Sequence, residues 1–272
     1  MSQAPAQVAG LVSRNRPEMA GLFLRMADMK PQVYLDPRPP EYFDQFHRSA
    51  RKRSVFMYSI ARVVLTPLVL LIYRVKAVGK ENVPRKGALV LAPNHFSQLD
   101  HFFAGVWLRR KVRFMAKSQL FGPPVLTFIF KHGGVFPVRR GHRDEEAFKT
   151  AYELIDQGEM LLVYAEGGRS RSGEMGEPKP GIGRIALESG APIVPVAIFG
   201  SAEARRWKHG RFPRVTVQFG KAMTFPVEKE ASRERQNEVA HEVFAEVKRM
   251  YEELATRSAA QPGHRNPDRA QA

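Results

Sequence analysis

A histidine and an aspartate stand five residues apart in the stretch NHFSQLD, residues 94–100. A neutral imidazole is a good general base when a carboxylate fixes its tautomer and stabilises the imidazolium. The spacing does not suit one face of a regular helix, where partners lie three or four residues apart. It suits a loop residue, His95, followed by a carboxylate, Asp100, in the first turn of a helix. The pair is therefore a candidate for general-base catalysis.

The same stretch has a structural alternative. Ser97 followed by Asp100 is typical of a helix start, with serine as the N-cap and an acid in the first turn. A metal site is a weaker alternative, because two ligands are too few for zinc and the neighbouring sequence holds no cluster of His, Cys or carboxylate residues. Taken alone, the pair favours the helix start, so other motifs must decide.

A second motif begins at Glu166, directly after a strongly apolar run. Gly167 and Gly168 let the backbone approach a ligand closely, while Arg169 and Arg171 supply positive charge. Glu166 can hold an arginine or a substrate hydroxyl. The lysine–serine spacing of a Walker loop is missing. The motif predicts an anion-binding loop, with a solvated basic turn as the alternative.

Two further apolar runs end in basic residues. GGVFPV is followed by Arg139 and Arg140, and VRFMA is followed by Lys117. Each charge alone is also compatible with an ordinary solvated surface. However, ligands of open α/β sheets bind at the carboxyl ends of the strands. Basic or ionisable residues at four strand ends therefore predict one shared binding edge.

The elements that position these motifs follow from the apolar pattern. Runs of strand length alternate with helical stretches from residue 75 onward, which predicts an α/β fold with a mixed β-sheet covered by helices on both faces. Strands are expected at 88–92, 112–116, 135–138, 160–165, 193–199 and 214–219, and helices near 98–110, 120–131, 143–157 and 180–189.

The flanking segments differ in composition. Residues 30–50 are rich in proline and aromatic residues and are expected to form an extended linker, and 17–29 are expected to form a short amphipathic helix. The expected organisation is a flexible N-terminal segment and linker at 1–50, a membrane-associating helix at 51–74, a main domain at 75–225, a C-terminal amphipathic helix packed on it at 226–258 and a disordered tail at 259–272.

The run from Val55 to Tyr73 is about long enough to span a bilayer. Arg62 inside it would cost roughly 2.5–3.5 kcal/mol at the bilayer centre, and Pro67 would kink it. Basic residues flank it on both sides, as in segments that bind anionic lipid surfaces. We expect an N-terminal membrane-interfacial helical segment; a spanning helix and a buried core helix are the alternatives.

The 272-residue chain has no cysteine and a formal net charge of +16. Disulfides and thiolate metal sites are excluded, and the charge favours an anionic partner such as nucleic acid, an anionic membrane or a phosphate-bearing small molecule. A secretory signal peptide is not expected from the first ten residues. No nucleic acid is expected as a partner, because the sequence lacks a nucleic-acid-binding motif.

Four stretches in order, NHFSQLD, GVFPVRR, EGGRS and PIVPVAI, resemble the four sequence blocks of the glycerolipid acyltransferase family, which includes the 1-acylglycerol-3-phosphate acyltransferases. The resemblance covers roughly residues 75–225. It implies that His95 deprotonates the acceptor hydroxyl and that Asp100 orients His95. It implies no metal or redox cofactor. The substrate-binding residues that it implies are Lys117, Arg140, Glu166, Gly167, Arg169 and Ser170.

The resemblance also implies the reaction and its setting. A fatty acyl group would move from acyl-CoA or acyl carrier protein to a lysophospholipid, most simply 1-acylglycerol-3-phosphate, giving phosphatidic acid. The protein would be membrane-associated at an anionic surface, with its active site on the cytoplasmic side. Glycerol 3-phosphate or another specialised lysolipid is an alternative acceptor, and a non-catalytic basic membrane-binding protein is an alternative function.

The sequence departs from the family pattern at three positions. Ala165 and Gly168 stand where the third block commonly has proline and threonine, which makes the loop more flexible and removes a hydroxyl. Arg139 stands where the family often has aspartate. Its added positive charge predicts an acceptor with a larger anionic head group.

Overall fold

The computed structural model describes residues 36–52, 56–140, 144–170, 172–204 and 212–260. The predicted helix at 17–29 and nearly all of the predicted tail at 259–272 lie outside these residues. The same holds for Arg171 of the second motif.

Within these residues, seven strands form one mixed sheet in the order β1-β7-β6-β2-β5-β3-β4, which confirms the predicted fold class. Neighbouring strands are parallel except β6 and β7, which are antiparallel. The short first strand was not predicted, because three residues with one apolar face carry too little pattern. The strands are β1 Lys76–Val78, β2 Leu89–Pro93, β3 Val112–Lys117, β4 Val135–Val138, β5 Met160–Leu162, β6 Ile193–Phe199 and β7 Thr216–Phe219.

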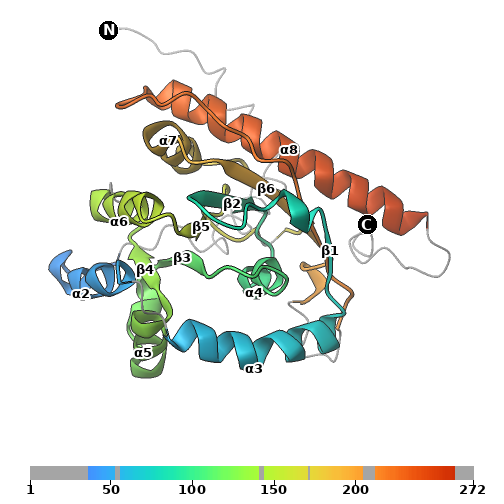
Figure 1. The fold of residues 1–272 in the computed structure, drawn as a ribbon, viewed down its shortest axis with the longest axis horizontal. Coiled ribbons are helices and arrows are strands. Elements are labelled where there is room, and N and C mark those ends of the chain that lie inside the picture. Colours follow the sequence, from blue (N-terminus) through green and yellow to red (C-terminus); the bar gives the residue numbers. More distant parts are fainter. Residues whose placement is uncertain (1–35, 53–55, 141–143, 171, 205–211, 261–272) are drawn as a thin grey trace, which may run out of the picture.

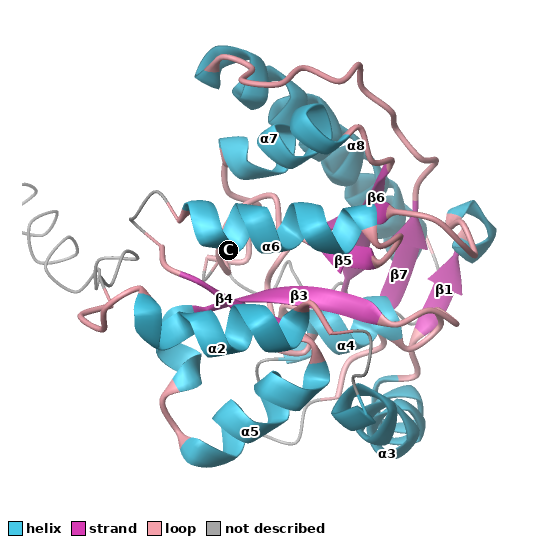
Figure 2. Cartoon of the chain, turned by 60° about the vertical axis from the view of Figure 1, so that its left-hand side comes forward, coloured by secondary structure: helices cyan, strands magenta, loops and turns pink. Residues whose placement is uncertain are grey.

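Helices cover both faces of this sheet (Figures 1 and 2). One buried cluster joins the sheet to α6, α7 and α8, and a second joins the other face to α3 and α4. Two helices, α2 and α5, lie at the β4 edge, and 3-10 turns follow β1 and β3. The helices are α2 Glu41–Ala50, α3 Phe56–Tyr73, α4 Asp100–Gly105, α5 Pro124–Gly133, α6 Glu145–Asp156, α7 Pro180–Ser189 and α8 Arg233–Ala259; the turns are η1 Lys80–Asn82 and η2 Ser118–Phe121.

The prediction of an extended linker up to residue 50 is wrong for its last ten residues, which form α2. Phe43 and Phe46 lie three apart on one helical face and are buried. The ring of Phe46 packs on that of Phe121 with centroids 4.8 Å apart. Proline is tolerated just before a helix and in its first turn. The prolines ahead of α2 therefore mark the start of the helix and do not indicate an extended linker.

The predicted apolar helix is present as α3, and one of its sides packs on the domain. Val69 and Tyr73 are buried, and the Tyr73 ring meets that of Phe103 at 5.1 Å. The Arg62 guanidinium donates to the backbone carbonyls of Leu108 and Arg110. By length and composition α3 suffices to cross a membrane, and 11% of it is buried. The hydrogen bonds of Arg62, the charged residue of α3, show that its side chain points toward the domain.

Candidate active site

Four parallel strands that neighbour one another carry the predicted residues at their carboxyl ends. β2 leads to His95, β5 leads to the loop with Glu166, β3 ends at Lys117, and β4 leads to Arg140. The order β2-β5-β3-β4 and the parallel register place these four ends along one edge of the sheet. This edge is where α/β sheets bind ligands.

The imidazole of His95 is bound to the carboxylate of Asp100. His95 Nδ1 lies 2.8 Å from Asp100 Oδ2, which also accepts the backbone N–H groups of Phe96 and Ser97 at 2.7 Å each. Asp100 is fully buried. With three donors around one oxygen, Nδ1 carries the proton and Nε2 is left as the basic nitrogen. This is the geometry of a general base with an orienting carboxylate.

The helix-start alternative holds in a modified form. α4 begins at Asp100, after Leu99, and the Ser97 hydroxyl accepts the N–H of Leu99 at 3.2 Å. Asp100 binds amides of the loop ahead of the helix and faces the imidazole. The stretch therefore forms a helix start and a His–Asp pair at once, since the serine orders the turn and the aspartate is free for the histidine.

Asn94 fixes the position of the His95 loop on the sheet. Its side-chain oxygen accepts the N–H of Ile198 at 2.7 Å, and its side-chain nitrogen donates to the Ile198 carbonyl at 3.2 Å. This pair extends the β2–β6 ladder by one step through a side chain. Sequence reasoning missed the role of Asn94, although the residue was visible as the first letter of the motif.

The ring of Tyr164 stacks on the imidazole of His95. Their centroids are 3.7 Å apart and their planes differ by 14°. Burial raises the pKa of the Tyr164 hydroxyl well above its usual value, with the nearby Asp100 charge adding to the shift. Tyr164 packs on one face of the imidazole, while Asp100 binds Nδ1 at its edge. Sequence reasoning assigned Tyr164 no role, because its position on the strand end gave no sign of a partner.

Glu166 binds backbone amides on two sides. Its Oε1 accepts the N–H of His95 at 2.9 Å, and its Oε2 accepts the N–H of Gly176 at 2.8 Å. The N–H of Ser170 donates to the His95 carbonyl at 2.9 Å. Burial raises the pKa of Glu166 despite these hydrogen bonds. The carboxylate predicted to hold an arginine or a substrate hydroxyl thus ties two loops to the base.

The glycines of the loop bring backbone and arginine together. Gly167 has φ +65°, and its N–H closes a turn on the Tyr164 carbonyl at 2.9 Å. A Cβ at Gly168 would lie 3.1 Å from Arg140 Nη1, so the guanidinium rests over this glycine. Burial lowers the pKa of Arg140, and the charge of Arg169 lowers it further. Two cations thus approach each other beside the loop.

The charges around His95 tune its protonation. Burial lowers the pKa of His95 below 6.5, and the hydrogen bond and charge of Asp100 act in the opposite direction. Arg169 and Arg140 lower the pKa further. The net result is an imidazole that is neutral at pH 7, as a general base requires. The charges of both arginines therefore reach this imidazole.

Known proteins that resemble this chain share one description. Residues 74–199 match the family model described as Acyltransferase. A 1-acyl-sn-glycerol-3-phosphate acyltransferase of Bacillus subtilis is 30% identical over 157 residues, which are 57% of this chain and 78% of that protein. The chain belongs to the acyltransferase family.

Further relatives match this acyltransferase-family chain over a smaller share of their length. A chloroplastic 1-acyl-sn-glycerol-3-phosphate acyltransferase of Brassica napus is 29% identical over 156 residues, 56% of this chain and 45% of that protein. The chain spans about half the length of the first curated relatives it matches. The crystal structure of a 1-acyl-sn-glycerophosphate acyltransferase from Thermotoga maritima shares the fold, with TM-score 0.54 and 22% identity over 78% of this chain and 88% of that one.

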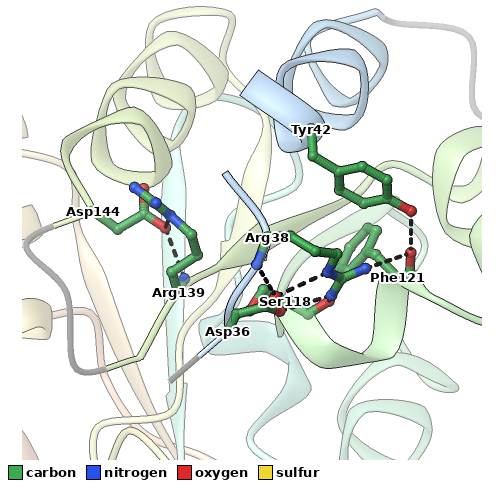
Figure 3. Close-up of polar contacts among 7 residues, drawn as sticks. All are labelled: Asp36, Arg38, Tyr42, Ser118, Phe121, Arg139 and Asp144. Carbon is green, nitrogen blue, oxygen red and sulfur yellow. Dashed lines mark hydrogen bonds and ion pairs between the residues drawn. The ribbon is translucent and has the colours of Figure 1, made fainter. Parts of the chain in front are cut away.

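Arg139 differs from its neighbour Arg140 in its surroundings. Its guanidinium Nε lies 3.6 Å from Asp144 Oδ2, and the same oxygen accepts the Arg139 backbone N–H at 2.7 Å (Figure 3). Asp144 is buried. The carboxylate balances the charge expected to enlarge the anion site, so that argument for a larger head group loses its support. In the sequence, Asp144 five residues after Arg139 was the signal that could have revealed this ion pair.

The segment ahead of α2 holds the turn that follows Lys117. Arg38 donates to the carbonyls of Ser118 and Phe121 at 2.7 and 3.1 Å, and Asp36 binds Arg38 in turn (Figure 3). Arg38 lowers the pKa of Asp36 well below its usual range. Lys117 itself is exposed at the end of β3, level with Val138 of β4. Sequence reasoning missed Arg38 because it read this segment as a linker.

A metal centre finds no support in the described part of the chain. Within it, no three His, Cys, Asp or Glu side chains gather as metal ligands.

Proposed function

We propose that this chain transfers a fatty acyl group from a thioester to the free hydroxyl of 1-acylglycerol-3-phosphate, giving phosphatidic acid. The observation that carries the proposal is the hydrogen bond of 2.8 Å between His95 and the buried Asp100, at a sheet edge where the charges of Arg140 and Arg169 act on His95. A base activates a hydroxyl, and cations bind a phosphate. The names of the relatives in Bacillus subtilis and Brassica napus point to the same reaction.

In the proposed step, His95 Nε2 takes the proton from the acceptor hydroxyl as its oxygen attacks the thioester carbon. A carbon–oxygen bond forms, and negative charge develops on the carbonyl oxygen. The carbon–sulfur bond then breaks, and the departing thiolate takes the proton from His95. Asp100 stabilises the imidazolium in between. The sequence of bonds needs no acyl-enzyme and no metal or redox cofactor.

Arg140 and Arg169 are the residues we assign to the acceptor phosphate, with Lys117 on the neighbouring strand end. Arginine binds phosphate through paired hydrogen bonds, and the packing of Arg140 on Gly168 limits its motion. Acyl-CoA and acyl carrier protein are both candidate donors. Because acceptor and product are lipids, we place the protein at a membrane with the active site on the cytoplasmic side.

The test is an acceptor panel. Lysolipids and glycerol 3-phosphate are offered with acyl-CoA and acyl carrier protein donors, and products are read by mass spectrometry. His95→Ala should lower the rate by about 10²–10⁴-fold. His241→Ala, at an exposed position of α8, is the matched control and should retain the rate. Undiminished transfer by His95→Ala, or no turnover with any phosphate-bearing acceptor, would overturn the proposal.

A further inference from the structure

Two helices expose large apolar side chains on the same side of the sheet. On α3, Val63 is 75% and Leu71 is 78% exposed; on α5, Val125 is 70% and Phe128 is 53% exposed. Both helices lie on the opposite side of the sheet from α7 and α8 (Figures 1 and 2). The α3–α5 apolar surface consists of Phe56, Ile60, Val63, Val64, Leu68, Leu71, Ile72, Val125, Leu126 and Phe128.

The two helices form one surface because aromatic rings join them. The His132 ring, near the end of α5, lies 5.2 Å from the ring of Phe56 at the start of α3. The same imidazole lies 4.6 Å from the ring of Phe128. The exposed apolar face of α3 therefore continues beyond Phe56, the first residue of that helix, onto α5. Contiguous apolar faces of this kind mark binding surfaces on soluble domains.

The charged side chains of both helices are engaged elsewhere. Arg62, the one charged residue in the α3 sequence, donates to the Leu108 and Arg110 carbonyls. Lys131, the one Lys or Arg in the α5 sequence, donates to Gln45 Oε1 at 3.4 Å. The exposed faces of the helices are therefore apolar.

The sequence stretches that carry the two helices are basic and contain no acidic residue. Neither residues 45–80 nor residues 101–143 contain an aspartate or glutamate, although the whole chain holds 27. Both stretches are rich in lysine and arginine. Arg62 holds residues 108–110 against α3, which brings the exposed Arg109 and Lys111 close to that helix. Such a rim attracts anionic lipid head groups around an apolar face. The exposed basic residues here include Lys52, Arg74, Lys76, Arg109 and Lys111.

We propose that α3 and α5 together dock on an anionic lipid bilayer, lying along its interface, so that α5 is a second membrane-binding element. A helix with one face packed on protein and the other face apolar and exposed suits the interface. Val69, Tyr73 and Arg62 hold the inner face of α3, so lipid cannot surround it. This inference rests on the proposed function in that it names the partner surface of a lipid reaction, but vesicle binding itself needs no turnover.

The position of α5 relates the bilayer to the binding edge. The ring of Phe130 in α5 packs on that of Phe121 with centroids 5.1 Å apart, and Phe121 closes the turn that begins after Lys117. Docking through α5 therefore brings the bilayer to the β3 end of the site. A lipid acceptor can reach this end without crossing the domain.

Vesicle flotation with the full chain tests the surface. Phosphatidylcholine vesicles are compared with vesicles in which about a third of the lipid is phosphatidylglycerol, without acyl donor or acceptor. Val125→Ser/Phe128→Ser should weaken binding to the anionic vesicles by about tenfold. Val227→Ser is the matched control, because Val227 is 59% exposed and lies beside Gly190 at the end of α7, on the other side of the sheet. Circular dichroism checks that each variant is folded.

A fluorescent probe tests contact with lipid directly. The chain has no cysteine, so Phe128→Cys and Val227→Cys can each be labelled at one site with a polarity-sensitive dye. Anionic vesicles should raise and blue-shift the emission at position 128 and leave position 227 unchanged. No change at 128, or binding of the double serine variant within twofold of the unmodified chain, would overturn the proposal. Neither outcome depends on whether the protein transfers acyl groups.

Discussion

The phenol ring of Tyr164 and the imidazole of His95 lie nearly parallel with their centroids 3.7 Å apart. Since Asp100 holds Nδ1 of the same imidazole, the ring is fixed both at its edge and on its face. Two contacts of different kinds therefore define the direction in which Nε2 points. In the proposed reaction, this direction decides whether the acceptor hydroxyl meets Nε2.

Removing the aromatic face should misplace the base. An aromatic pair contributes about 0.5–1.5 kcal/mol beyond buried area, so Tyr164→Leu is expected to lower kcat by roughly tenfold. Tyr164→Phe keeps the ring and is expected to stay within about threefold of the unmodified enzyme. Steady-state kinetics with both variants measures the difference. Equal losses in the two variants would show that the hydroxyl, and not the stacked ring, matters.

The pH profile should report the charges around His95. Its pKa is lowered below 6.5, mainly by burial, so the acid limb of kcat/KM should lie below pH 6.5. Arg169 lowers this pKa further, so Arg169→Met should move the acid limb to higher pH. Asp100 raises it, so Asp100→Asn should move the limb to lower pH, in addition to slowing the reaction. Shifts of the same sign in both variants would contradict this electrostatic account.

The glycine over which Arg140 rests should govern acceptor binding. A Cβ at Gly168 would lie 3.1 Å from Arg140 Nη1, so Gly168→Thr requires the guanidinium to shift by at least a few tenths of an ångström. Hydrogen bonds to charged groups contribute about 1.5–3 kcal/mol, and we expect KM for the phosphate acceptor to rise by roughly tenfold or more. Gly181→Ala is the control, because its Cβ would have only an ordinary contact, 3.6 Å from Phe148. An unchanged KM in the threonine variant would remove Arg140 from the phosphate site.

The hydrogen bonds that Arg38 donates to the turn after Lys117 should affect the site at a distance from His95. Arg38→Ala removes two hydrogen bonds to the Ser118 and Phe121 carbonyls, and leaves the buried Asp36 without its cation. We expect a loss of about 1–3 kcal/mol in the free energy of unfolding, measured by denaturant titration. Below the melting range, KM for the acceptor should rise while kcat stays nearly constant. A fall in kcat alone would argue against positioning of Lys117 through this turn.

Much of the candidate site was visible in the sequence because its information is local. Apolar runs of strand length marked six of the seven strands, and the residues that follow them, from His95 to Arg140, were named from their positions at the strand ends. The spacing of His95 and Asp100 already required a loop followed by a helix. The three-residue β1 escaped, because so short a run carries no reliable period.

The partners of the polar side chains needed the tertiary structure. Glu166 ties together the amides of His95 and Gly176, which stand 71 and 10 residues away from it in the chain. Arg139 was expected in the anion site and instead lies against Asp144, while Arg140 beside it rests on Gly168. Two adjacent arginines have the same local pattern, so nothing in their order distinguishes them. Periodicity along the chain sets which residues form strands and helices, but the partner of a charge depends on which elements the sheet brings side by side.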